Sequence, residues 1–573
     1  MRFSMHKVRR YALHIAACCF LLSTTGWAGE DKPHQAAPPQ GNALSRIFRG
    51  NYEVPSVTGF DLNGEATLDA MIKDGKLLLS AEDALRLALE NNIDINVERY
   101  NPYFSLWGIQ QSKAVLNPYV LFNTSLNRVV NPTASALQGA PTTFNINNLY
   151  NVTVHKPFEQ GLDMDVNFNV TRYRTNNVFS SLNPAFTPNL SVNFTQHLLK
   201  DYGRIVRGRY LWIARNNYGI SQEAFAARVR DIVTAVLNSY WDVVFNDEDI
   251  RVKEASRGLA EVILQQNRIQ AEVGTMAPLD VVQAEAEVAA REEAVVLAKF
   301  NKRISEDQLK KLISSRQDPG MITAPVAPLS KPEPPAQPLV DVRTAIQRAV
   351  DNRQEIKQLQ TNQENNQIQV DYARNQLRPS LDLVAGYSQN GLGGDTILRD
   401  YSQGIFSAPI LSVTPGGFWD SMSSLFSQRY LGYILGFNLR IPIGNDDARA
   451  ASAQAQINYK QGEARIASQR QTIALEVRQA YENIAMNEAL MKTAEVTVRY
   501  QQQRLQGEQD KYALGATITR FILEAQRDLQ SAQNRLLQAK INLIKSRIAL
   551  DKAVGDTLAA HNIELRDALQ PLK

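Results

Sequence analysis

Residues 84–92 read ALRLALENN and residues 345–353 read AIQRAVDNR, so the chain repeats a helix-forming pattern after 261 positions (345 − 84 = 261). The same shift places Leu116-Asn117-Pro118 on Leu377-Arg378-Pro379. A shift of 241 places Val273-Gly274-Thr275 on Leu514-Gly515-Ala516. We therefore predict an internal twofold repeat, in which each copy has a helix, strands, a very long helix, a glycine tip and a return helix.

Between the first helix and the long helix, apolar and polar residues alternate. At residues 162–170, Leu, Met, Val, Phe and Val alternate with Asp, Asp, Asn and Asn, the period of a strand with one apolar face. We expect four strands in the first copy, at about 118–129, 149–157, 162–173 and 189–198. In the second copy we expect two, near 381–388 and 431–441.

The turns between these strands differ in length. Residues 131–148, 175–188 and 391–417 are rich in Asn, Pro, Thr or Gly and predict long loops, whereas 157–161 predicts a short turn. One apolar face, with short turns at one end and long loops at the other, is typical of an outer-membrane barrel. A soluble β-sandwich is the alternative, but it would lack the very long helices between strands.

Residues 204–273 and 447–514 contain no proline, and apolar residues recur there at three- and four-residue spacing. At about 1.5 Å per residue, a helix of about 70 residues is roughly 105 Å long. Such a helix must pack along other long helices rather than inside a compact domain. The return helices, near 279–314 and 518–554, run about half as far. We expect helices at 84–116, with a break at Asn101-Pro102, and at 342–377 to complete each column.

The N-terminal segment has the pattern of a secretory signal: a basic start, an apolar stretch and small residues before a cleavage point after Ala28. Cys18 and Cys19 lie inside it, so the mature chain would have no thiol for a disulfide or a metal. A loose lipobox before Cys18 makes lipidation the alternative. The expected divisions are a signal peptide (1–28), a polar N-terminal extension (29–78), a first repeat (79–318), a Pro-rich linker (319–340), a second repeat (341–555) and a C-terminal tail (556–573). Strands would occupy 118–198 and 380–443 of the repeats.

Composition excludes several classes of function. The formal net charge of +4 is small for 573 residues, and no basic cluster with interleaved aromatic residues predicts a nucleic-acid partner. No later stretch has the 18 or so apolar residues of a spanning helix, so any membrane span would consist of strands. The four histidines after residue 28 are scattered, and no catalytic or nucleotide-binding motif occurs. We expect no enzyme activity, no catalytic residue, no bound metal and no cofactor.

Two tip sequences carry a family resemblance: AEVGTMAPLDVVQAEAEV at 271–288 and YALGATITRFILEAQRDL at 512–529. Together with the duplicated helix openings, Pro118 and Pro379 at strand entries and Ile441-Pro442-Ile443-Gly444 at a strand exit, they resemble the outer membrane efflux proteins, the TolC-like outer membrane factors. The resemblance covers about 79–555. It implies an α+β membrane protein: a trimeric β-barrel of four strands per protomer, continued by a long periplasmic α-helical barrel with a small mixed equatorial region.

This chain departs from the family pattern in one respect. The first copy reads as four strands where the family has two. Either the barrel is larger than twelve strands, or one pair of strands forms an extracellular or inner elaboration. We expect the elaboration.

The resemblance also implies a function. The chain would be an outer-membrane exit duct that extends into the periplasm of a Gram-negative-type envelope and serves a tripartite efflux or type I secretion system. Its partners would be two further copies in a homotrimer, outer-membrane lipid, a periplasmic adaptor (membrane fusion) protein that opens the tip, and an inner-membrane transporter. The alternative is a periplasmic coiled-coil scaffold without channel activity.

Site residues follow from matching the tips to the family. The expected tip and adaptor contacts are Gly274, Thr275, Gly515, Ala516, Ala284 and Ala525. Asp280 and Tyr512 would form a gate latch near Arg520, although Asp280 also suits the positive end of the return helix on its own. Phe521 and Glu524 occupy positions where the family often has two aspartates, so they would form the constriction ring; an ordinary solvated helix face is the alternative.

Basic and aromatic residues gather where strands give way to the first long helix. Lys200, Arg204, Arg207 and Trp212 would lie at the membrane interface, where cations meet lipid phosphates and indole rings favour the headgroup level. The alternative is a solvated run of charge at a helix start.

Overall fold

The computed structural model describes residues 52, 54–55, 71–133, 141–315, 323–333, 340–402, 404 and 408–563. The chain divides into two compact units, 1–61 with 569–573 and 62–568, and every element below belongs to the second. The expected signal peptide, the lipidation alternative at Cys18, most of the polar extension and the end of the C-terminal tail lie outside the described residues.

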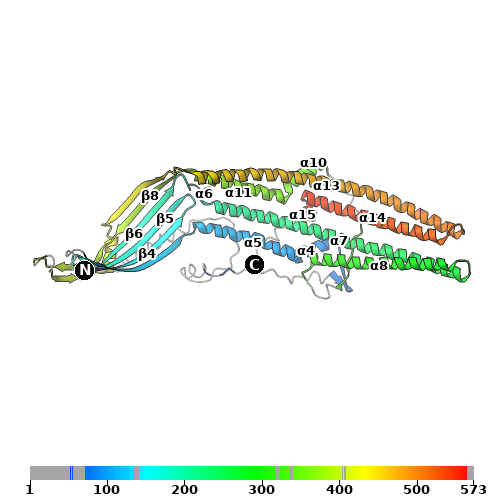
Figure 1. The fold of residues 1–573 in the computed structure, drawn as a ribbon, viewed down its shortest axis with the longest axis horizontal. Coiled ribbons are helices and arrows are strands. Elements are labelled where there is room, and N and C mark those ends of the chain that lie inside the picture. The colour runs from blue at the N-terminus through cyan, green and yellow to red at the C-terminus, as the bar shows by residue number, and fades with distance from the viewer. Residues whose placement is uncertain are drawn as a thin grey trace. The chain divides into compact units, whose positions relative to one another are not determined.

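Four strands of the first half form one antiparallel sheet in chain order (Figure 1). They are β3 (Tyr119–Pro132), β4 (Thr142–Pro157), β5 (Leu162–Thr175) and β6 (Leu182–His197). Residues 189–197 of β6 then pair with β8 (Ser380–Asn390), and β8 pairs with β11 (Leu431–Arg440). Residues 182–186 of β6 pair instead with β9 (Gly393–Arg399), and β9 pairs with β10 (Ile410–Thr414). The sheet therefore joins strands from both halves of the sequence.

The sheet has one apolar and one polar face. Partners in register are Phe122, Val152, Phe168 and Leu190, so these side chains share a face. The opposite face carries side-chain hydrogen bonds: His155 Nδ1 lies 2.7 Å from Asp165 Oδ1, and Thr153 Oγ1 donates to Asn167 Oδ1 at 2.7 Å. The alternation predicted from the sequence thus gives a sheet with one apolar face and one polar face.

The four strands expected in the first half are confirmed, while the expectation that one pair forms an extracellular or inner elaboration of the barrel stays a prediction. All four lie in one sheet with continuous register, and β6 connects them to β8. The loops expected at 131–148 and 175–188 are shorter than expected, because β3 reaches Pro132, β4 begins at Thr142 and β6 begins at Leu182.

The expected loop at 391–417 is also wrong, since it contains β9 and β10 and leads into α12 (Phe418–Phe426). Glycine-rich sequence usually disfavours strands. Here glycine provides space instead: a Cβ on Gly391 would lie 2.4 Å from the Ser421 carbonyl oxygen, and one on Gly393 would lie 2.5 Å from the Ser421 nitrogen. The glycines let α12 lie directly against the strands.

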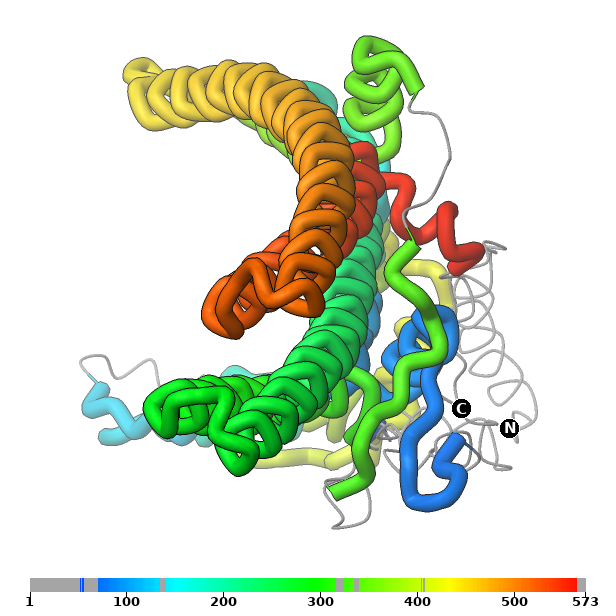
Figure 2. The backbone as a smooth tube through the Cα atoms, turned by 90° about the vertical axis from the view of Figure 1, so that its right-hand side faces the viewer, coloured from blue at the N-terminus to red at the C-terminus, as the bar shows by residue number. Residues whose placement is uncertain are grey.

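The helices form long columns that leave the sheet. After the short α6 (Arg204–Arg207), α7 (Arg209–Glu272) has 64 residues, and α13 (Asp446–Ala513) has 68, or roughly 96 and 102 Å. Shorter helices pack along them: α4 (Ala81–Asn91), α5 (Ile93–Lys113) and α8 (Pro278–Ile313) along α7, and α10 (Val342–Asn352), α11 (Gln354–Gln376) and α14 (Thr519–Val554) along α13. Viewed along the helices, α7 and α13 follow a curved layer, and α14 contacts both (Figure 2). Among the described residues, no helix has the length and apolar character to cross a membrane.

The break expected at Asn101-Pro102 is wrong, because α5 continues through Pro102. The helix breaks at Asn92, whose backbone is extended (φ −69°, ψ 121°) and whose side chain accepts a hydrogen bond from the Ile95 N–H at 3.0 Å. Asn92 therefore ends one helix and caps the next, whereas the helix continues through Pro102. The corresponding break in the second half is at Arg353 (353 − 92 = 261).

A small mixed sheet lies beside α7. In it β1 (Ile72–Lys73) and β2 (Lys76–Leu79) are antiparallel, and β7 (Val326–Pro328) is parallel to β2. The fully buried Tyr240 of α7 donates its hydroxyl to the Leu79 carbonyl and accepts from the Ser330 N–H, both at 3.2 Å. Parts of the polar extension and of the Pro-rich linker are thereby fixed to the long helix.

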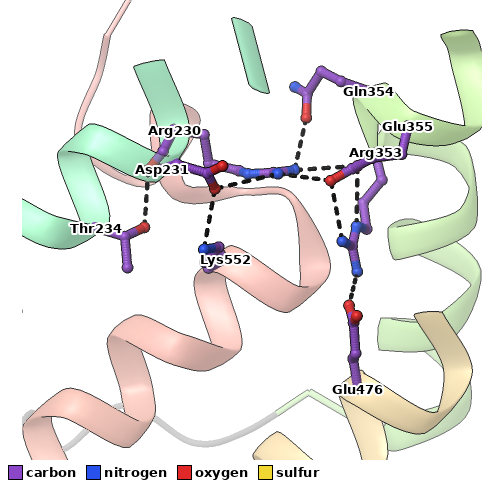
Figure 3. A network of polar contacts seen from close by, with 8 residues as sticks. All are labelled: Arg230, Asp231, Thr234, Arg353, Gln354, Glu355, Glu476 and Lys552. Atoms are coloured by element: carbon purple, nitrogen blue, oxygen red, sulfur yellow. Dashed lines mark hydrogen bonds and ion pairs between the residues drawn. The ribbon is translucent and has the colours of Figure 1, made fainter. Parts of the chain in front are cut away.

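A buried network fixes the break at Arg353 (Figure 3). The Arg230 guanidinium, with 3% of its side chain exposed, donates to Glu355 Oε1 at 2.7 Å and to Gln354 Oε1 at 3.0 Å. Arg353 also donates to Glu355, and it pairs with Glu476 of α13. Burial alone would raise the pKa of Glu355, but hydrogen bonds from Arg230 and Arg353 outweigh it and lower that pKa to about 2. The network joins α7, α11 and α13.

The network predicts an acid-sensitive helical region. Because the folded pKa of Glu355 lies below its ordinary value of 4.5, its stabilisation is complete above pH 4.5 and is lost as the pH falls toward 2. We expect Glu355→Gln to lower the free energy of unfolding at pH 7 by up to about 3 kcal/mol and to flatten its dependence on pH between 4.5 and 2. Thermal unfolding followed by circular dichroism measures both, with the exposed Glu364→Gln on the same helix as control. Identical pH curves for Glu355→Gln and the unmodified protein would contradict this role.

Candidate functional site at the helical tips

Both long helices end in the same turn. Gly274 (φ +80°) and Gly515 (φ +73°) adopt the left-handed conformation that favours glycine. The Gly274 and Thr275 N–H groups donate to the carbonyls of Ala271 and Gln270 at 3.1 and 2.9 Å. At the second tip, the Gly515 and Ala516 N–H groups donate to Tyr512 and Lys511, both at 2.9 Å. Each helix therefore closes in a Schellman motif that reverses the chain within a few residues.

The six expected contact residues divide into two groups. Gly274, Thr275, Gly515 and Ala516 are exposed at the ends of the hairpins. Ala284 and Ala525 are instead buried, with 1% and 0% exposed, and Ala525 packs in a cluster with Ile263, Leu505 and Leu529. In this conformation the first four present a surface, whereas the two alanines hold the hairpins together.

Tyr512 contacts the first hairpin, but through a different residue than expected. Its hydroxyl donates to Gln270 Oε1 of α7 at 3.0 Å and accepts from Thr519 Oγ1 at 3.4 Å. Asp280 is exposed at the start of α8, and no hydrogen bond or ion pair links it to Tyr512 within the described part of this chain. Arg520 is exposed as well. One chain alone does not assemble the expected latch.

The contact of Tyr512 with Gln270 was missed by sequence reasoning, as was a second one at Arg291. The Arg291 side chain is 5% exposed and donates to the Ser256 carbonyl at 3.0 Å, to Ser256 Oγ at 2.6 Å and to the Leu523 carbonyl at 3.4 Å. It is also paired with Glu287 at 2.9 Å. One buried guanidinium thus ties α7, α8 and α14 together. The signal that could have found it is a lone arginine on the alanine-rich face of α8.

The two residues expected at the constriction, Phe521 and Glu524, differ in their contacts within the chain. Phe521 is 46% exposed. Glu524 lies 3.6 Å from Arg504 of α13, which also pairs with Asp528 at 2.6 Å. The charge of Glu524 is therefore partly balanced within its own hairpin, while Phe521 presents an apolar ring to its surroundings.

At the base of the sheet the four expected interface residues also differ. Arg207 pairs with Asp163, and His197 lies between Asp163 at 3.3 Å and Asp382 at 2.7 Å, so Arg207 is engaged within the chain. Arg204 is exposed, Lys200 is partly buried and Trp212 is 40% exposed. The side chains of Lys200, Arg204 and Trp212 are at least partly accessible at the surface of the chain. Across the residues the structure describes, no group of three His, Cys, Asp or Glu side chains is placed to hold a metal ion.

Comparisons with known proteins point to one family. The model of the family "Outer membrane efflux protein" matches residues 162–315 and 345–556. A search of curated proteins finds no match.

Solved structures share the fold. A structure of CusC has a TM-score of 0.59 and 16% identity, and covers 83% of this chain and 92% of its own. The CmeC outer membrane channel of Campylobacter jejuni has a TM-score of 0.55 and 15% identity, with 91% and 94% covered. The MtrE outer membrane channel of Neisseria gonorrhoeae, in its open state, has a TM-score of 0.55 and 14% identity, with 88% and 98% covered.

The Arg291 contacts predict how firmly the tips are held. We expect Arg291→Met to weaken the tip by about 2–3 kcal/mol, because it removes the buried hydrogen bonds to Ser256 and Leu523 and leaves the Glu287 carboxylate without this partner. Arg268→Met is the matched control: its ion pair with Glu285 is about half exposed, so its loss should cost less than about 1 kcal/mol. Hydrogen exchange of the amides in 256–291 and 505–529 measures both. Equal protection in the two variants would contradict the assignment.

Proposed function

The chain belongs to the outer membrane efflux protein family, and from this membership we propose that three copies form a passive exit duct opened at its helical tips. The protein resides in the outer membrane and extends into the periplasm. The proposed duct has a barrel of a few strands per copy, continued by a barrel of long helices. The observation that carries the proposal is one chain that joins an apolar-faced sheet to helices roughly 100 Å long.

Unpartnered helix faces support the assembly of several copies. On α8, Leu297, Phe300 and Ile304 are each more than half exposed and share one face. On α13, Met486 and Leu490 are both 52% exposed and also share a face. Apolar rows of this kind on long helices are covered when helices of neighbouring copies pack alongside.

We also propose that the two halves, 79–318 and 341–555, are structural repeats. Helix breaks 261 positions apart and identical turns at both tips support this. The segments 1–28, 29–78, 319–340 and 556–573 remain, as proposals, a signal peptide, a polar extension, a linker and a tail.

The exposed tip residues fit a docking and gating role. Gly274, Thr275, Gly515 and Ala516 would contact a periplasmic adaptor, and an inner-membrane transporter would supply energy. Asp280 would reach Tyr512 of a neighbouring copy, with Arg520 close by, and hold the closed state. Phe521 and Glu524 would narrow the bore above the tips, while Lys200, Arg204 and Trp212 would lie at the lipid headgroups.

Planar bilayers test the duct directly. We expect the purified, detergent-extracted protein to run as a heat-modifiable trimer and to give ion conductance that is low at rest, because the tips are closed. A soluble protein that never conducts would favour the scaffold alternative and contradict the duct.

The latch makes a separate prediction. Asp280→Ala removes three hydrogen bonds per trimer, each contributing about 0.5–1.5 kcal/mol, so resting conductance should rise. Glu292→Ala, on the same helix and also exposed, is the control and should leave conductance unchanged. Unchanged conductance in Asp280→Ala, with conductance intact in the unmodified protein, would reject the latch but not the duct.

A further inference from the structure

We propose that all six long strands of each copy line the membrane wall, so that three copies close an eighteen-stranded barrel (3 × 6 = 18) through a seam between β3 and β11. This inference rests on the proposed trimer. The sheet is continuous, and its neighbouring strands are, in order, β3, β4, β5, β6, β8 and β11. The pairing of β3 with β4 runs without a gap from Tyr119–His155 to Pro132–Thr142. The hairpin of β3 and β4 is therefore paired along its full length.

The two outer strands leave their edges open. Every residue of β3 is exposed, as are eight of the ten residues of β11. Unpaired backbone N–H and C=O groups are not tolerated in hydrocarbon, and a sheet of six strands cannot close on itself around a lumen. Both edges therefore need another strand, and no strand of the described chain pairs with them.

Strand direction identifies that partner as another copy of the same chain. All neighbours in the sheet are antiparallel, so the sixth strand runs opposite to the first. The β3 strand of one copy consequently meets β11 of the next in antiparallel fashion, like every other pair. This contact is head-to-tail, and repeated by rotation it generates a closed ring with an even number of strands.

The sequence repeat predicts the register of the seam. Within one chain His197 of β6 pairs with Asp382 of β8. The repeat shift of 241 makes Asn438 on β11 the equivalent of His197 (197 + 241 = 438). The shift of 261 makes Leu121 on β3 the equivalent of Asp382 (382 − 261 = 121). Asn438 should thus face Leu121 of the next copy, and Phe437 should face Phe122. This register pairs all of Leu431–Arg440 with residues 119–128.

The faces of the strands provide an independent check. Across the sheet, Phe122 is in register with Leu190, Leu190 with Gln389 and Gln389 with Leu431, so Phe122 and Leu431 share the apolar face. Phe437 lies six residues beyond Leu431 and is on that face too. The proposed seam therefore joins two exposed phenylalanines, 61% and 67% exposed, in one apolar band. A slip by one residue would place Phe437 opposite the polar lining.

An eighteen-stranded wall changes the size of the duct. With strands about 4.8 Å apart and tilted by about 40°, twelve strands give a backbone diameter of about 24 Å and eighteen give about 36 Å. The cross-section is then about twice as large. The limit on what passes through this protein would lie in the helical part rather than in the membrane.

Engineered disulfides across the seam test the proposal. The only native cysteines, Cys18 and Cys19, lie in the expected signal peptide, so introduced pairs would be the only thiols of the processed chain. Phe122→Cys with Phe437→Cys probes the apolar face, and Leu121→Cys with Asn438→Cys probes the other face. Phe122→Cys with Asn438→Cys is the matched control, because its two positions lie on opposite faces.

We expect both in-register pairs to give covalent trimers on oxidation, resolved by non-reducing electrophoresis, and the control to stay largely monomeric. Each variant is first shown to form a heat-modifiable trimer, and the two pairs serve as replacements for each other if one fails to fold. An intact, conducting trimer without either cross-link would overturn the seam while leaving the duct in place. Efficient cross-linking of Phe437→Cys to a cysteine at Met164, Val166 or Phe168 of β5 would also overturn it, because β3 and β4 would then lie outside the wall.

Discussion

Backbone hydrogen bonding is the constraint on which the rest of this structure depends. In hydrocarbon each unpaired N–H or C=O costs several kcal/mol, so a wall of strands must have no edge. The backbone groups of the inner strands pair within this chain, whereas the outer edges of β3 and β11 have no pairing strand among the described residues. In the proposed trimer, the exposure of these two strands is a property of the single copy, and the wall is completed when copies meet.

The helical part faces the same requirement in a different form. A helix of 64 or 68 residues cannot gain enough stability from its own hydrogen bonds and must cover its apolar stripe. Shorter helices cover part of each stripe, and the break between them is fixed by polar groups: Asn92 in one half, and Arg353 with Glu355 in the other. The apolar rows left on α8 and α13 are the helical equivalent of the open strand edges.

Much of the fold could be predicted from the sequence, because long proline-free segments and strict alternation are strong local signals. The four strands of the first half and the glycine tips were read from such patterns. The break at Asn92 was not, because a capping asparagine is a weaker signal than a proline such as Pro102. The glycine-rich sequence of β9 and β10 predicts a loop, because the benefit of Gly391 and Gly393 comes from α12, which lies more than twenty residues later. The contacts of Arg291 and Tyr512 depend on which helices meet at the tip, and this information is tertiary.

The central claim is that one chain supplies a segment of membrane wall and a segment of helical duct, and that threefold repetition completes both. Electron cryomicroscopy of the full-length protein in lipid nanodiscs measures this most directly. We expect a threefold particle with one continuous bore, from a wall of eighteen strands to closed helical tips. A single copy with no bore would contradict this claim, and a closed wall from which β3 and β4 are absent would contradict the wall of eighteen strands.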